Sequence, residues 1–109
     1  MSMNQQSKIF IAGHKGMVGS ALVRTLKNNG YNNLVKRTSS ELDLTIQSDV
    51  SNFIAQEQPE IVFIAAAKVG GIHANNMYRA DFIYENLMIQ SNLIHASHVA
   101  SVKKLLFLG

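Results

Sequence analysis

The sequence predicts an α/β protein in which strands and helices alternate around a parallel sheet. Short apolar runs recur along the chain and are separated by segments with helical spacing. Glycines at 13, 16 and 19 directly follow the first of these runs. The run at 61–67 is apolar without alternation, which is typical of a parallel strand buried on both faces. Right-handed crossovers then give a doubly wound sheet with its five predicted strands ordered 3-2-1-4-5.

The first half of the chain contains a predicted strand–helix–strand unit. We expect a strand over 8–12 and a helix over about 16–29, which Gly30 closes in the left-handed conformation. A second strand at 33–36 leads to a polar loop, and residues 41–44 form a short third strand. The inward stripe of the first helix follows helical spacing and consists of Val18, Ala21, Leu22, Thr25 and Leu26.

The second half repeats the alternation. Thr45 is the expected N-cap of a helix that runs to about Gln56, and Pro59 starts the next strand at 61–67. The inward residues of this helix are predicted to be Ile46, Val50, Phe53 and Ile54. A loop at 68–76 precedes a long helix, from 78 or 81 to 99, and a final strand covers 104–108. Asn86 falls among the inward positions of that helix and is expected to be hydrogen-bonded there.

Length and composition limit the possible functions. The 109 residues form one domain at most, with residues 1–7 disordered and residues 8–109 the N-terminal part of a Rossmann-type domain that continues past its fifth strand. No apolar run has the length of a membrane span, and no cysteine is present, so a cytoplasmic protein is expected. The net charge of +3 is not gathered into a run, which argues against a nucleic-acid partner.

The glycines have the spacing G-x-x-G-x-x-G between a strand and a helix, which is typical of a dinucleotide site. Gly13 permits the tight turn, Gly16 lets the backbone approach a pyrophosphate, and Gly19 lets the helix pack closely on the strand. The helix N-terminus then presents free N–H groups to the phosphates. The predicted cofactor-binding residues here are Gly13, His14, Lys15, Gly16, Met17, Val18 and Gly19.

The end of the second strand indicates which dinucleotide binds. An NAD site places an acid about 20 residues past the glycines, but this chain has Lys36 and Arg37 there. With Lys15 they suit a 2′-phosphate, so NADP(H) is the predicted cofactor. The alternative is that Lys36 and Arg37 are only a solvated strand end. Asp43 would lie near the adenine or would cap the next helix.

Three segments make the chain resemble the GDP-L-fucose synthase family of the extended short-chain dehydrogenases/reductases. They are Ile9 to Ser20, Ala65 to Tyr84 with its Lys-Val-Gly-Gly-Ile stretch, and Lys103 to Gly109. The resemblance covers nearly the whole chain from Lys8. It implies a cytosolic homodimer that uses NADPH to epimerise and reduce a GDP-sugar, GDP-4-keto-6-deoxy-D-mannose, to GDP-L-fucose.

The resemblance also implies roles for particular residues. The adenosine would be followed by Ser39, Ser40, Glu41, Leu42, Asp43 and Leu44, and the nicotinamide side would be touched by Leu108 and Gly109. Some members carry arginine at the position of Ser39, so a 2′-phosphate here must rely on Lys15 and Arg37. The family's catalytic serine, cysteine and Tyr-x-x-x-Lys pair all lie beyond Gly109. Neither Tyr78 nor Tyr84 has a lysine four residues later, so no catalytic residue is assigned and the chain alone is expected to be inactive.

Other interpretations remain open. Another nucleotide-sugar epimerase or dehydratase would hold NAD and show an acid near Arg37, and a non-catalytic dinucleotide-binding module would need only this fold. His95 and His98 have metal-ligand spacing without a third ligand, so no metal site is predicted. His73 would line a substrate pocket or lie in an exposed loop. The helix at 81–99 is expected to form a homodimer through a second face, unless that face packs under a loop; the face consists of Tyr84, Leu87, Met88, Ser91 and His95.

Overall fold

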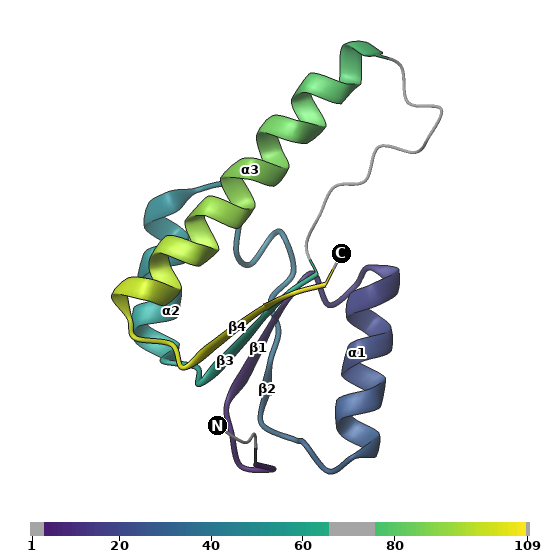
Figure 1. Ribbon diagram of the computed structural model, residues 1–109, viewed down its shortest axis with the longest axis vertical. Coiled ribbons are helices and arrows are strands. Elements are labelled where there is room, and N and C mark those ends of the chain that lie inside the picture. The colour runs from purple at the N-terminus through teal and green to yellow at the C-terminus, as the bar shows by residue number, and fades with distance from the viewer. Residues whose placement is uncertain (1–3, 66–75, 109) are drawn as a thin grey trace.

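The computed structural model describes residues 4–65 and 76–108, and describes side chains for 4–65 and 83–108. Strands and helices alternate along the chain as expected (Figure 1). The elements are β1 (Ile9–Ala12), α1 (Met17–Asn28), β2 (Leu34–Val35), α2 (Gln47–Glu57), β3 (Ile61–Ile64), α3 (Asn76–Val99) and β4 (Lys104–Phe107). The predicted loop at 68–76, with His73, lies outside the described residues except at its last position.

The strands form one parallel sheet in the order β2-β1-β3-β4. In its register Phe10 lies beside Val35 on one side and Val62 on the other. The chain moves outward from β1 to β2, returns across β1 to β3, and then continues to β4. The direction therefore reverses between β1 and β3, and in open parallel sheets ligands bind at the carboxyl ends of the strands near such a point.

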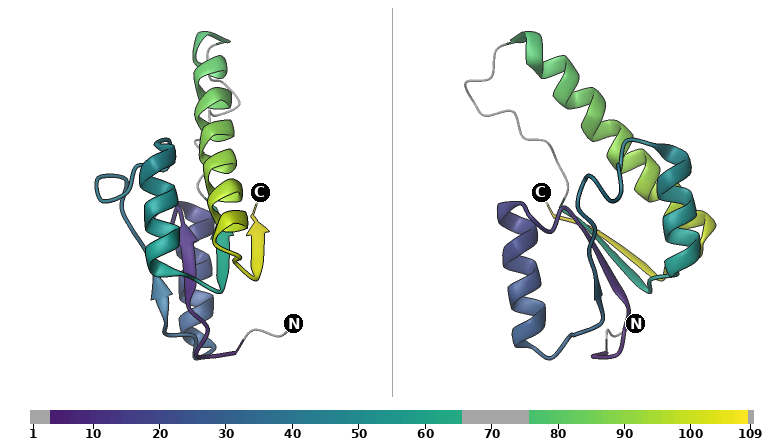
Figure 2. Two further views of the ribbon diagram at one scale, coloured as in Figure 1. Left: turned by 90° about the vertical axis from the view of Figure 1, so that its left-hand side faces the viewer. Right: turned by 180° about the vertical axis from the view of Figure 1, so that it is seen from behind.

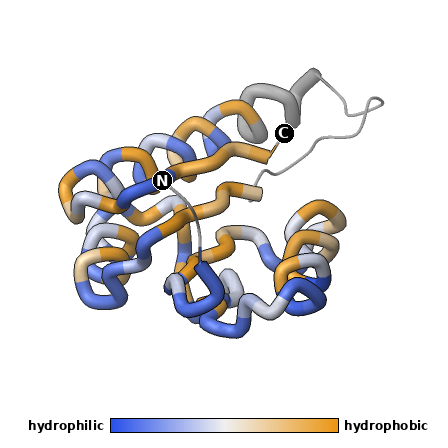
Figure 3. The backbone as a smooth tube through the Cα atoms, turned by 60° about the horizontal axis from the view of Figure 1, so that its bottom comes forward, coloured by the Kyte–Doolittle hydropathy of each residue, from blue (hydrophilic) through white to orange (hydrophobic). Residues whose placement is uncertain are grey.

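Helices cover both faces of the sheet, with α1 on one face and α2 and α3 on the other (Figure 2). Successive strand residues face opposite sides. Ile9 and Ile11 therefore pack with Leu26 of α1, and Phe10 packs with Ile54 of α2 and Leu93 of α3. The apolar segments in Figure 3 converge on these strands. This two-layer cover confirms burial on both faces for 61–64 of the strand predicted at 61–67; Ala65 is half-buried, and 66–67 lie outside the described residues.

The expected third strand at 41–44 is absent, so the described sheet has β4 where a fifth strand was predicted. Side-chain hydrogen bonds bend this segment into turns instead. The Glu41 Oε1 atom accepts the Thr38 N–H at 2.7 Å, and the Asp43 Oδ1 atom accepts the Thr45 N–H at 3.0 Å. Such local bonds give the backbone an alternative to a sheet ladder. Asp43 thus engages Thr45 itself, and Ile46 occupies the N-cap position that we assigned to Thr45.

Two predicted helix faces are also partly wrong. In α1 the packed stripe is Gly19, Leu22, Val23 and Leu26, whereas Val18 is 48% exposed. Gly19 fixes this rotation because it must lie against the loop before the helix. In α2, Val50 and Ile54 are buried and Phe53 packs on the core, but Ile46 is 43% exposed.

The chain before β1 differs from the expected disordered segment over residues 4–7. Ser7 is buried, and its hydroxyl donates to the Glu60 carboxylate at 3.2 Å. The Gln5 amide donates to the Asn29 carbonyl beside Gly30, whose φ of 86° confirms its left-handed conformation. These contacts close the amino-end side of the sheet. Within the described residues, no helix combines the length and apolar character needed to cross a membrane.

Candidate functional site

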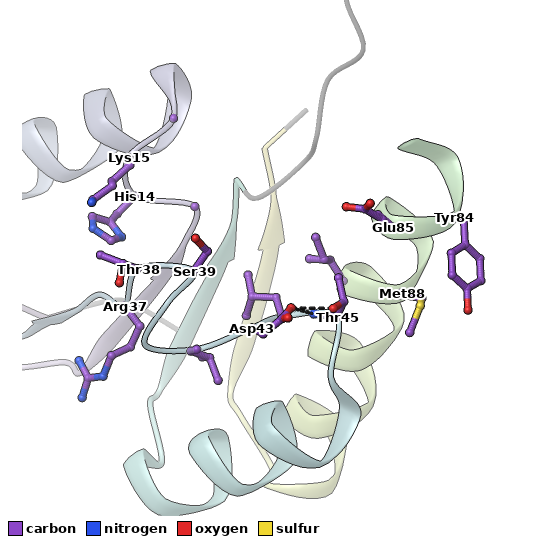
Figure 4. Close-up of a pocket in the computed structure, with 15 residues that line it drawn as sticks. His14, Lys15, Arg37, Thr38, Ser39, Asp43, Thr45, Tyr84, Glu85 and Met88 are labelled. Atoms are coloured by element: carbon purple, nitrogen blue, oxygen red, sulfur yellow. Dashed lines mark hydrogen bonds between the residues drawn. The ribbon is translucent and has the colours of Figure 1, made fainter. Parts of the chain in front are cut away.

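A pocket of about 740 Å³ lies at the carboxyl ends of β1 and β2 (Figure 4). Three segments line it: the glycine loop after β1, the polar turn after β2, which we define as residues 37–45, and one side of α3. The lining residues are Gly13, His14, Lys15, Gly16, Arg37, Thr38, Ser39, Leu42, Asp43, Leu44, Thr45, Tyr84, Glu85, Met88 and Ile89.

The glycine loop owes its shape to backbone constraints. Gly13 has a φ of 87°, which only glycine adopts readily, and the Gly16 N–H donates to its carbonyl at 3.1 Å. A Cβ on Gly19 would lie 1.9 Å from the Gly13 carbonyl oxygen, so this position admits no side chain. The partner of Gly19 is therefore the loop backbone and not the strand. A Cβ on Gly16 would meet only that same oxygen, at an ordinary 3.5 Å, so contacts within the protein do not require glycine there.

The side chain of His14 extends from the glycine loop toward the polar turn (Figure 4). Its Nδ1 atom is buried and has no hydrogen-bond partner among the described residues. Burial lowers the pKa of His14, the positive charges of Lys36 and Lys15 lower it further, and Glu41 opposes the shift. A buried polar atom without a partner is uncommon in a folded protein. His14 as a residue lines the pocket, in which a ligand could supply the partner.

The polar turn begins with a reciprocal pair of hydrogen bonds between Thr38 and Glu41. The Glu41 carboxylate accepts the Thr38 N–H at 2.7 Å, and the Glu41 N–H donates to the Thr38 hydroxyl oxygen at 3.3 Å. This is the capping-box arrangement that usually starts a helix, although no helix follows at once. The Thr38 bonds, and after them the nearby Arg37, lower the pKa of Glu41. The pair holds Ser39 at the pocket side of the turn (Figure 4).

Arg37 contributes to the lining, but its guanidinium points away from His14 and Lys15 (Figure 4). It donates from Nη1 to the Lys36 carbonyl at 2.8 Å and lies 5.3 Å from the centre of the Phe53 ring. Its Nη2 atom is 3.7 Å from the Glu57 carboxylate. In this structure the guanidinium is therefore held against α2.

Helix α3 forms the far side of the pocket. Tyr84, Glu85, Met88 and Ile89 recur at helical spacing and contribute to the lining of the pocket. The buried Asn92 amide donates to the Leu44 carbonyl at 2.9 Å and ties the helix to the turn. A bond of the kind predicted for Asn86 is therefore made by Asn92, six residues further along the helix.

The structure thus brings together nine of the predicted cofactor residues: Gly13, His14, Lys15, Gly16, Arg37, Ser39, Leu42, Asp43 and Leu44. Those outside the lining are Met17, Val18, Gly19, Ser40, Glu41 and Leu108, and Gly109 lies outside the described residues. Leu108 instead packs beneath the sheet on the α1 side. Sequence reasoning missed six pocket residues: Thr38, Thr45, Tyr84, Glu85, Met88 and Ile89. The Thr-x-x-Glu pattern at 38–41 would have located the turn.

No metal-binding group of three His, Asp or Glu side chains occurs in the part of the chain that the structure describes. His95 and His98 are both exposed on α3, away from the lining of the pocket.

A parallel sheet with a glycine loop and a pocket at the carboxyl ends of its first strands defines a Rossmann-type, NAD(P)-binding class of protein. Residues 9–109 match the NAD dependent epimerase/dehydratase family. The chain belongs to this family.

Several relatives are similar over nearly the whole chain. GDP-L-fucose synthase 1 of Arabidopsis thaliana is 62% identical over 99% of this chain and 34% of its own length. GDP-L-fucose synthase of Escherichia coli (strain K12) is 57% identical over 95% of this chain and 32% of its own length. A solved GDP-mannoheptose C4 reductase from Campylobacter jejuni, with NADP bound, is 55% identical with a TM-score of 0.94, over 99% of this chain and 34% of its own. The chain therefore spans about a third of the length of the relatives it matches.

Proposed function

We propose that this chain is the NADP(H)-binding part of a GDP-L-fucose synthase, which converts GDP-4-keto-6-deoxy-D-mannose to GDP-L-fucose by epimerisation and hydride reduction. The observation that carries the proposal is the pocket itself. A glycine loop forms one side of it, and the strand end that would hold the acid of an NAD site carries Lys36 and Arg37 instead. The identity of 62% to a GDP-L-fucose synthase supports the choice of substrate class.

The residues present fit a dinucleotide. Gly16 leaves open space where a side chain would otherwise stand, and the first N–H groups of α1 follow it directly. The orphaned Nδ1 of His14 would gain a partner from a bound phosphate or ribose. Leu42, Leu44 and Met88 provide apolar surface for the adenine ring. Among the remaining predicted residues, Ser39, Ser40, Glu41 and Asp43 would follow the adenosine.

The charges near the end of β2 would select the phosphorylated cofactor. Lys15 and Arg37 contribute to the lining of the pocket, and Lys36 directly precedes Arg37 after the end of β2. Guanidinium and ammonium groups bind phosphate through charge-assisted hydrogen bonds. Bound NADPH supplies the hydride for reduction, and the residues of this chain bind and orient it.

A second candidate is a reductase of another GDP-sugar. Both the 55% sequence identity and the TM-score of 0.94 to a GDP-mannoheptose C4 reductase favour this alternative. Both candidates use the same pocket for NADP(H), so cofactor binding does not separate them. Measuring the turnover of each GDP-sugar by the full-length enzyme would separate the two candidates.

Calorimetric titration of the purified protein with NADPH and NADH tests the cofactor assignment. We expect tighter binding of NADPH, and its advantage should shrink as salt is raised from 50 to about 500 mM because the extra contact is ionic. Equal affinity for the two dinucleotides at low salt would contradict the assignment. Binding is the appropriate measurement because the sequence analysis assigns no catalytic residue to this chain.

We also propose a homodimer formed through α3. The helix extends beyond the sheet (Figure 1), and the apolar side chains Ile83, Tyr84 and Leu87 on this part are 56%, 64% and 57% exposed. Contiguous exposed apolar surface favours association. Sedimentation of Leu87→Lys should show a weaker dimer than the unsubstituted protein. A concentration-independent monomer before substitution would refute the dimer.

A further inference from the structure

Besides the Lys36 carbonyl, two residues that lie one turn apart on α2 contact the Arg37 side chain. Phe53 offers its ring face to the guanidinium at 5.3 Å, and Glu57 approaches the Nη2 atom at 3.7 Å. Phe53 is itself fixed, because its ring packs against that of Phe10 in β1 at a centroid distance of 4.8 Å. The guanidinium therefore lies against Phe53 and Glu57, neither of which lines the pocket.

This hold is weak enough for a ligand to displace it. Glu57 makes its shorter contact with Lys8, at 2.9 Å, and the Lys8 hydrogen bond is the main reason that the pKa of Glu57 is lowered. The Arg37 side chain is 36% exposed, so solvent screens its longer contact with Glu57. A phosphate can accept two parallel hydrogen bonds from a guanidinium, which is a stronger arrangement.

We propose that Glu57 is a specificity-determining positioning residue, which holds Arg37 on α2 in competition with the 2′-phosphate and so sets the preference for NADPH over NADH. The inference rests on the function proposed above. Glu57 does not line the pocket, so its effect on the cofactor must pass through Arg37. NADH has no 2′-phosphate and therefore does not compete for the guanidinium.

The substitution Glu57→Gln keeps the size of the side chain and removes its charge. We expect the ratio of NADH to NADPH dissociation constants to rise roughly two- to fivefold, the range for an exposed ion pair. NADH affinity itself should stay within error. A purely structural role for Glu57 predicts the opposite, because a loosened Arg37 would weaken NADPH binding.

Two controls separate coupling from a general charge effect. Asp49→Asn makes the same charge change on α2, about 12 Å along the helix from Glu57, and should leave the ratio unchanged. In an Arg37→Ala background, Glu57→Gln should no longer change the ratio. If Glu57→Gln raises it equally in that background, the inference is wrong.

If Glu57→Gln folds poorly, a second variant with the opposite expected effect on cofactor preference still tests the inference. Lys8→Gln removes the nearer partner of Glu57, leaves its carboxylate to Arg37, and should lower the preference for NADPH. An unchanged or higher preference in Lys8→Gln would overturn the inference. Binding of both dinucleotides with no response to either variant would overturn it while sparing the proposed function. Binding of neither would overturn both.

Discussion

Two loops face each other across the pocket and are built by different means. The glycine loop takes its shape from the backbone: Gly13 has a positive φ, and Gly19 has no room for a Cβ. The polar turn takes its shape from side chains, because Glu41 binds Thr38 and Asp43 binds Thr45. The first loop tolerates almost no substitution at its fixed points, whereas the second depends on exposed bonds that compete with water.

The difference suggests a division of work in the proposed site. A backbone-determined loop is rigid before the ligand arrives and suits the pyrophosphate that all dinucleotides share. The polar turn carries Arg37, which together with Lys15 of the glycine loop would bind the 2′-phosphate that only NADP(H) has. Substitutions of the glycines should therefore affect folding and both cofactors, and substitution of Arg37 should affect discrimination.

The largest effect is expected for Gly19→Ala. The new Cβ would lie 1.9 Å from the Gly13 carbonyl oxygen, so the helix and loop must separate. We expect the free energy of unfolding to fall by about 3 kcal/mol, at the upper end for overpacking. Urea denaturation of the two proteins measures this change.

The matched substitution Gly16→Ala places its Cβ at an ordinary distance from the same atom. It should cost less than about 1 kcal/mol of stability, the scale of an N-cap change. If Gly16→Ala destabilised the protein as much as Gly19→Ala, the loop geometry described here would be wrong.

Arg37→Ala tests the other loop. We expect NADPH binding to weaken by about 1.5–3 kcal/mol, the range for a charged hydrogen bond, with little change for NADH or for stability. Titration calorimetry with both cofactors provides the comparison. A parallel loss for NADH would assign Arg37 to the loop's structure and not to discrimination.

His14 should make stability depend on pH. Its folded pKa lies below the usual 6.5, so between the two values the unfolded chain binds more protons than the folded one. The free energy of unfolding should consequently decrease as pH falls from about 7.5 to 5.5. His14→Asn should flatten this part of the profile, measured by urea midpoints across the range. An identical slope in the variant would show that His14 does not cause it.

The smallest effect is expected for Glu41. Its folded pKa lies below 4.5, so the stability from its Thr38 bond is present above that pH and is lost as pH falls through the folded pKa. Glu41→Gln should lower the urea midpoint slightly at pH 7 and by less at pH 3. Because Glu41 is exposed, a large loss at pH 7 would mean that the turn supports more than itself.

The difference between backbone-determined and side-chain-determined segments also explains which elements could be predicted from the sequence. β1, α1, Gly30 and the buried run at 61–64 were predicted correctly, because glycine positions and apolar periodicity act through the backbone and the core. The strand predicted at 41–44 failed because Leu42 and Leu44 imitate a strand's alternation while the polar residues between them form turns.

Contacts between residues far apart in the chain could not be predicted from the sequence either. The spacing of α3 predicted a helix but not that Glu85 and Met88 would reach the polar turn. The conformation of Arg37 depends on Phe53 and Glu57, which follow it by 16 and 20 residues. Charge alone placed Arg37 near the site and gave no indication of its partners.

In the proposed site both loops bind the same NADP(H) molecule. Amide chemical shifts in a ¹⁵N-labelled sample, followed during titration with NADP⁺, test it most directly. We predict that the largest changes fall within 13–19 and 37–45, and that NAD⁺ reproduces the first set but only part of the second. Changes confined to other segments, or none at saturating cofactor, would contradict the claim.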